Sequence, residues 1–303
     1  LGFKLERHET RVRQFVEFFE EQKASRITTK LALQFATQDP DLNSKTKASR
    51  LSVVRAFARY RIGTDPTTEI PPLGLLPYGP RRTHPYIYSE AEIRLLLTAA
   101  KNYPSRNRFP GWGRFQGWTF YCIFGLLAVT GMRVGEVLNL QAGDIDWTEG
   151  VLTVRNAKFG KSRLVPLHRS TQKVLARFVR DRDRLFAQQQ PGQPLVHLFV
   201  SSCGTRLHVA RIRKVFWQLS RQIGLRAPGA RQGPRIHDFR HRFAVETLLR
   251  WYQCGEPVDR RMPVLSTYLG HTNVSSTYWY LSCTPKLMAA AGDRLEQRWK
   301  GIR

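Results

Sequence analysis

The sequence predicts a mainly α-helical protein with a small antiparallel β-sheet, an α+β fold divided into a helical N-terminal domain and a larger mixed domain. Three observations lead to this prediction. Apolar residues recur at helical spacing over most of the chain. Two short runs of alternating apolar residues lie close together near its middle, as in a hairpin. A proline-rich stretch without periodicity separates residues 1–63 from the rest.

The N-terminal domain, residues 1–63, is predicted to be entirely helical. Its apolar residues, among them Val12, Phe15 and Phe19, lie three or four positions apart. Asn43 or Ser44 can cap a helix with a basic face suited to contacts with phosphates. A solvated face is the alternative for each of its members. The face consists of Lys45, Lys47, Arg50, Arg55 and Arg59.

Residues 64–85 are predicted to form a linker, because six prolines exclude a long helix or a central strand there. A polyproline-like segment is stiff, so the linker would act as a semi-rigid spacer between two lobes.

The second domain, residues 86–303, is predicted to begin with a helix that Ser89 caps. A long apolar helix over 115–129 should end at Gly131. Strands at 151–154 and 163–167 flank a lysine-bearing turn and indicate a hairpin. Further helices are expected over 171–188, 209–223, 237–251, 263–269 and 285–299.

The charge points to a polyanionic partner. The 49 Lys and Arg residues against 23 Asp and Glu give a net charge of +26, most of it after residue 80. Nucleic acid is favoured over an anionic membrane or a merely solubilising surface. The longest apolar run is far shorter than the roughly 20 residues of a membrane span. Four widely spaced cysteines give neither a zinc pattern nor a disulfide framework.

Charged and titratable residues follow the long apolar helix. Arg133 lies two positions after Gly131, where the long helix should end. Glu136 lies three positions later, on the same face as Arg133 if a new helix starts there. Such a glutamate can hold the arginine's planar fork in place. The alternative is an ordinary surface ion pair.

A second cluster opens at His237, where His237 and Arg240 would share one face of a helix N-terminus. A helix N-terminus favours anions. His237 and His241, four positions apart, could instead bind a metal, but a third ligand is not evident in the sequence. A core or capping histidine is a further alternative for His237.

The last cluster sets His271 and Tyr280 nine positions apart. Tyrosine is a poor nucleophile at neutral pH, since its free pKa is about 10. A catalytic tyrosine therefore needs neighbours that stabilise negative charge.

The order Arg, Lys, His-x-x-Arg, Leu-Gly-His and Tyr resembles the tyrosine recombinase (phage integrase) family of site-specific DNA recombinases. The resemblance covers the second domain, and the first resembles that family's core-binding domain. Together, the four matching phrases are highly specific: Thr130 to Glu136, Arg163 to Leu167, His237 to His241, and Leu269 to His271 followed by Tyr280.

This resemblance implies strand cleavage and rejoining through a 3′-phosphotyrosyl intermediate, without metal or nucleotide cofactors, for integration, excision or transposition. Arg133 and Arg240 would clamp the scissile phosphate, and His271 would add a hydrogen bond. Lys158 would protonate the leaving 5′ oxygen. His237 would assist proton transfer and Tyr280 would attack. Glu136 would support Arg133, and Lys161 and Arg163 would contact DNA.

Two assignments compete with others. Lys161 is the alternative to Lys158 at the hairpin tip, and the register of the following strand favours Lys158. Tyr278 is the alternative to Tyr280, but residues two apart on a helix point about 200° apart, so only one can face the phosphate. The family's spacing selects Tyr280, which leaves Tyr278 and Trp279 to pack.

The resemblance also implies partners: double-stranded DNA with an inverted-repeat core site, and a homotetramer on two such sites or an assembly with sister recombinases. The expected location is a prokaryotic cytoplasm, at the nucleoid. A C-terminal helix with Leu287, Met288, Leu295 and Trp299 would dock on a neighbouring protomer. Residues 253–263 lengthen the interval before His271 relative to the usual pattern. A catalytically silent accessory subunit and a topoisomerase-like enzyme are the competing functions.

Overall fold

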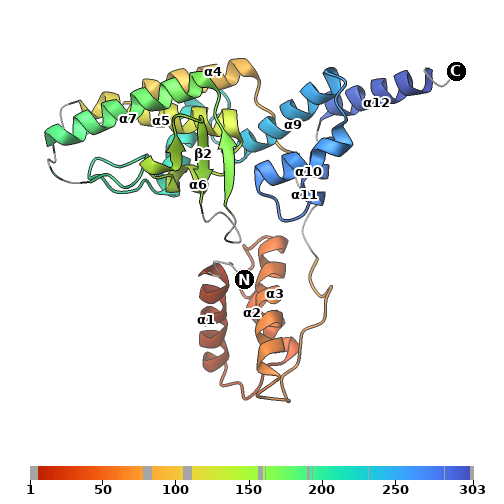
Figure 1. Cartoon of the computed structure of the whole chain (residues 1–303). Coiled ribbons are helices and arrows are strands. Elements are labelled where there is room, and N and C mark those ends of the chain that lie inside the picture. Colours follow the sequence, from red (N-terminus) through yellow and green to blue (C-terminus); the bar gives the residue numbers. More distant parts are fainter. Residues whose placement is uncertain are drawn as a thin grey trace. The chain divides into compact units, whose positions relative to one another are not determined.

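The structure is a computed structural model that describes residues 6–77, 84–104, 111–155, 160, 162–189, 192, 194–230, 232–282 and 284–300. The chain divides into two compact units, Leu1–Thr83 and His84–Arg303. Both units are built mainly from helices, and the second also contains a three-stranded antiparallel sheet (Figure 1). The predicted fold class is therefore confirmed.

The first unit contains three helices around one apolar core: α1 (Glu6–Glu21), α2 (Thr29–Thr37) and α3 (Ser44–Arg61). Each helix contributes buried residues, and the Phe15 ring lies edge-on to the Phe35 ring at 5.2 Å. The side chain of Asn43 accepts a hydrogen bond from the Thr46 backbone at 2.9 Å, so it caps α3 as expected.

The segment after α3 folds back onto the first unit. Arg55 donates hydrogen bonds to the carbonyls of Pro71 and Pro72 at 2.6 and 2.7 Å. Glu69 bonds to the start of α2, and Leu76 packs against the helical core. Most of the stretch read as a spacer from its prolines is thus attached to the first unit.

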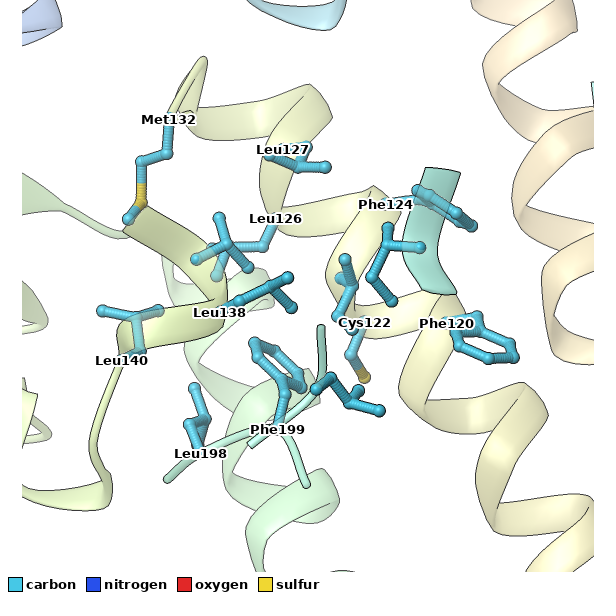
Figure 2. Close-up of a cluster of buried hydrophobic side chains, with 14 of the residues drawn as sticks. Phe120, Cys122, Phe124, Leu126, Leu127, Met132, Leu138, Leu140, Leu198 and Phe199 are labelled. Atoms are coloured by element: carbon cyan, nitrogen blue, oxygen red, sulfur yellow. The ribbon is translucent and has the colours of Figure 1, made fainter. Parts of the chain in front are cut away.

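Helix α5 (Trp112–Thr130) is the centre of the second unit. It packs against α4 (Glu90–Lys101), α7 (Arg169–Gln189) and α9 (Asp238–Gln253). Because α5 has neighbours on several sides, its buried side chains surround the helix (Figure 2). At its end, Gly131 adopts a left-handed conformation with φ 61°, which stops the helix as predicted.

The sheet runs in the order β1 (Ile145–Asp146), β2 (Val151–Val154) and β3 (Arg163–Pro166), with antiparallel neighbours. Leu152 pairs with Val165, and both are fully buried against the core. The predicted hairpin is confirmed. Strand β1 was not predicted, because two residues are too few to show an alternating pattern.

The remaining helices are α6 (Val134–Asn139), α8 (Val209–Gln222), α10 (Val258–Leu269), α11 (Ser275–Tyr278) and α12 (Pro285–Lys300), with short 3-10 turns at Ala142–Asp144 and Trp279–Ser282. Of these, α10, α11 and α12 lie with α9 at the other end of the unit (Figure 1), whereas α6 packs against α5 and α8, and α8 packs against α4. None of the described helices combines the length and apolar composition needed to cross a membrane.

Helix α10 begins five residues earlier than predicted, and the prediction that it starts at Pro263 is wrong. Proline inside a helix removes one backbone hydrogen bond. Val258 and Met262 lie one helical turn apart, and both precede Pro263. Both are buried in the cluster shared with α9, and this packing lets the helix begin before the proline.

Substituting Gly131 by alanine should destabilise the second unit. An added Cβ would lie 2.7 Å from Cδ1 of Phe243, and the left-handed backbone disfavours a side chain. We expect a loss of about 1–3 kcal/mol in the free energy of unfolding, measured by urea denaturation. Gly135→Ala is the control, because nothing lies within 4 Å of its Cβ and alanine favours the α6 helix. Equal losses in both variants would contradict this account.

Candidate active site

The C-terminus of α10 gathers three arginine side chains. Arg163 Nε donates to the Tyr268 carbonyl at 2.7 Å, Arg240 Nη2 donates to that of Leu269, and Arg133 Nη2 donates to that of Gly270 at 3.1 Å. The carbonyls one turn earlier are bonded by the backbone N–H groups of residues 270 and 271. The last carbonyls of a helix lack intrahelical partners and carry partial negative charge, so they suit cations.

Arg240 is the most enclosed of the three, with 1% of its surface exposed. Its Nη1 atom donates to the Gly131 carbonyl at 3.0 Å, which joins the end of α5 to the end of α10. Burial and the nearby charge of Arg133 lower the pKa of Arg240 to about 10. The guanidinium therefore stays charged at neutral pH.

Glu136 balances part of this positive charge. Its Oε1 atom accepts from Arg133 Nη1 at 2.8 Å, and its Oε2 atom accepts from the Arg133 backbone N–H at 2.9 Å. Arg163 donates to both oxygens, at 3.1 and 2.7 Å. Burial would raise the pKa of Glu136, but the bonds and charges of Arg163 and Arg133 outweigh it and hold the pKa at about 2. The predicted support of Arg133 by Glu136 is present in the geometry.

His271 directly follows Gly270, whose left-handed conformation, φ 65°, ends α10. The backbone N–H of His271 bonds to the Ser266 carbonyl at 3.0 Å, and its Nδ1 atom hydrogen-bonds to the Thr277 hydroxyl at 2.7 Å. Thr277 is fully buried. The imidazole is therefore held on the same helix end as the arginines.

His237 precedes α9, the helix that carries Arg240. The protein around its ring displaces water and lowers the pKa of His237, and the positive charge of Arg240 lowers it further. Its ring lies 4.8 Å from that of His241, which in turn contacts Trp279 and Tyr280. The described residues contain no cluster of three His, Cys, Asp or Glu side chains suited to a metal ion.

Tyr280 lies in the 3-10 turn Trp279–Ser282 and keeps 3% of its surface exposed. Its ring stacks beside His271 at 6.1 Å between centroids and lies 5.5 Å from His241. Tyr278, by contrast, is 45% exposed, so the prediction that it packs is wrong. The two tyrosines face different ways, as residues two apart on a helix do.

Lys158 and Lys161, the candidates for the general acid, lie outside the described residues. The side chain of Arg163, a predicted DNA contact, is 8% exposed, and its guanidinium bonds Glu136 and the Tyr268 carbonyl.

On α3, in the other unit, Lys45 is exposed. Lys47 donates to the Pro40 carbonyl at 3.0 Å, and the Arg50 guanidinium lies 5.0 Å from the centre of the Phe35 ring. Arg55 binds Pro71 and Pro72. Several members of the predicted basic face therefore have partners within their own unit.

A pocket of about 550 Å³ opens beside Arg133 and His237. Sequence reasoning missed its other basic and aromatic lining residues, which come from α8 and the segment before α9: Arg213, Phe216, Trp217, Arg226 and Arg235. The high arginine content of the chain was the available signal, but composition does not say which arginines meet.

A phage integrase family model matches residues 89–286. The chain belongs to the phage integrase family. It is 47% identical to "Putative integrase/recombinase y4rB" of Sinorhizobium fredii, over 99% of this chain and 94% of that protein. It is 29% identical to tyrosine recombinase XerA of Pyrococcus furiosus, over 70% of this chain and 63% of that protein. The predicted assignment to the site-specific tyrosine recombinases, as an enzyme of DNA recombination, is confirmed.

Solved structures agree in fold. The Tn1549 transposon integrase in complex with transposon right end DNA matches this recombinase with a TM-score of 0.63 at 16% identity, over 95% of this chain and 92% of that chain. XerH bound to palindromic difH substrate, in a post-cleavage complex, also gives 0.63, at 17% identity over 89% and 73%. At these identities the likeness concerns the fold.

The Glu136 carboxylate should make the stability of the recombinase depend on pH. Its pKa is about 2 in the folded chain and 4.5 ordinarily, so its contribution is fully present above pH 4.5 and is lost as the pH falls toward 2. The shift corresponds to roughly 3 kcal/mol. Urea denaturation should show the stability difference between wild type and Glu136→Gln narrowing below pH 4.5.

Glu9→Gln is the control for this pH series, because the Glu9 to Arg13 ion pair is exposed and contributes little. If the stability difference between wild type and Glu136→Gln stays constant below pH 4.5, the Glu136 carboxylate does not stabilise the fold through its ionised, hydrogen-bonded form.

Proposed function

We propose that this recombinase cleaves DNA by attack of the Tyr280 oxygen on a phosphodiester, forming a 3′-phosphotyrosyl bond and releasing the 5′ oxygen. The observation that carries the proposal is the convergence of Arg133, Arg240 and His271 on one helix end, with the Tyr280 ring stacked beside His271. In the second step the 5′-hydroxyl of a partner strand attacks the phosphotyrosine and the tyrosine leaves.

Each side chain has a chemical task in this reaction. The guanidinium groups of Arg133 and Arg240 stabilise the charge that develops on the nonbridging oxygens, to which arginine can bond through two N–H groups. His271 donates a further hydrogen bond. His237 accepts the tyrosine proton, and Lys158 supplies the proton that the leaving 5′ oxygen takes up. Glu136 keeps Arg133 in place.

The lining of the pocket beside Arg133 supports DNA as the substrate. Arg213 and Arg235 add positive charge next to the proposed phosphate site, and Trp217 presents a 44% exposed indole. Both groups suit a nucleic acid strand, arginine for its phosphates and an aromatic ring for its sugars or bases. The net charge of +26 agrees with this partner.

We also propose that the helical first unit contacts the core DNA site through α3, where Lys45 remains exposed. Recombination between two inverted-repeat sites would then involve four protomers. On α12, Leu287 packs inside its own unit, whereas the other predicted docking residues are exposed: Met288, Leu295 and Trp299. These three are available for a neighbouring protomer.

Replacing Tyr280 by phenylalanine should abolish covalent attachment to DNA while leaving DNA binding near wild type, because only the nucleophilic oxygen is removed. A nicked suicide substrate traps the covalent complex, which survives denaturing electrophoresis. Tyr278→Phe is the matched control, because that side chain is exposed and should keep its adduct. An adduct that persists in Tyr280→Phe would refute the assignment of the nucleophile.

The rate of strand cleavage should fall in acid with an inflection below pH 6.5. His237 accepts a proton only when neutral, and its pKa lies below its ordinary 6.5 because of burial and the charge of Arg240. Single-turnover cleavage should therefore be independent of pH near neutrality and slow down as His237 becomes protonated. The inflection should disappear in His237→Gln and persist in His241→Gln; the opposite pattern would move the role to His241.

A further inference from the structure

Arg163 connects the β-hairpin to the arginine cluster at the end of α10. It is the first residue of β3 and pairs with Val154 of β2. Its side chain leaves the sheet, is 8% exposed, and reaches Tyr268 through Nε. A Cβ on Gly270 would lie 3.1 Å from Arg163 Nη1, so the guanidinium packs directly against the α10 cap.

The contact between Arg163 and Glu136 fixes the plane of the carboxylate. The two guanidinium nitrogens of Arg163 bond the two carboxylate oxygens, a forked arrangement that sets both distance and orientation. Oε1, which accepts from Arg163 Nη1, also accepts from Nη1 of Arg133. The position of Arg133 therefore depends on a carboxylate that Arg163 holds.

We propose that Arg163 is a positioning residue for strand cleavage, which holds the Arg133 guanidinium through Glu136 in the orientation that binds the nonbridging oxygens of the scissile phosphate. This inference rests on the proposed role of Arg133 in catalysis. It replaces a direct DNA contact by Arg163, because the buried guanidinium is directed at Glu136 and Tyr268.

The substitution Arg163→Lys tests the geometry of the Arg163 side chain separately from its charge. Arg163→Lys keeps the positive charge but has no planar fork, so it cannot bond both Glu136 oxygens and the Tyr268 carbonyl in the same way. Misplacement of a catalytic group by about 1 Å costs on the order of 100-fold in rate. We expect a loss of that order in single-turnover cleavage, with DNA affinity nearly unchanged.

A double-mutant cycle with Arg133→Lys tests whether Arg163 acts through Arg133. Arg133→Lys removes the planar guanidinium that Arg163 is proposed to position. The factor by which Arg163→Lys slows cleavage should therefore be at least about 10-fold smaller in the Arg133→Lys background than in wild type. A variant that only reduced the folded fraction would multiply the rate by the same factor in both backgrounds. Equal factors would overturn the proposal.

Arg182→Lys is the matched control, because Arg182 is also buried, with 3% of its side chain exposed. It bonds Asp183 and the carbonyls of residues 197 and 198, none of which belongs to the arginine cluster. Its effect on cleavage should be the same in both backgrounds. If Arg163→Lys does not fold, as thermal denaturation would show, Glu136→Gln replaces it in the cycle with the same expected result.

A substrate with sulfur in place of the 5′ bridging oxygen tests the other route, through the hairpin. A thiolate leaves without protonation, so this substrate should rescue a variant whose general acid is misplaced. Arg163→Lys should remain slow on it, and rescue to the wild-type rate would overturn the proposal. Failure of the proposed function would look different: wild type would form no covalent adduct, or Arg133→Lys would cleave as fast as wild type.

Discussion

The site depends on the last carbonyls at the C-terminal end of α10. Three consecutive carbonyls, of residues 268–270, each accept a hydrogen bond from a different arginine. The arginines come from three distant parts of the chain: the loop after α5, strand β3, and the first turn of α9. One helix end therefore serves as the common reference for groups that lie 30 to 107 residues apart in the sequence. Cations of like charge can gather there because the helix terminus and Glu136 offset their repulsion.

Two glycines make this arrangement possible. Gly131 ends α5 and offers its carbonyl to Arg240, and Gly270 ends α10 and lies against Arg163. Both have positive φ, which lets each helix stop and the chain turn within one residue. The buried core around α5 includes Leu127 and Met132, on either side of Gly131 (Figure 2). Core packing, the left-handed conformation of the two glycines and the charge of Glu136 thus all act on the same group of arginine side chains.

The sequence predicted the chemistry-bearing residues better than it predicted their connections. Arg133, Arg240 and His271 stand out by residue type and order, and the structure brings them together. The contacts of Arg163 were not predictable, because its partners are a carbonyl and a shared carboxylate whose positions depend on the complete fold. The start of α10 was misplaced because a proline usually marks a helix beginning, whereas here packing of Val258 and Met262 extends the helix past it.

The hydrogen bonds from Arg55 to Pro71 and Pro72, together with the packing of Leu76, attach the segment after α3 to the first unit. Among the described residues beyond Leu76, the next buried one is Pro85, in the second unit. The nine residue steps from Leu76 to Pro85 span at most roughly 32 Å when fully extended. The chain between these two anchors is therefore much shorter than the proline-rich stretch of residues 64–85.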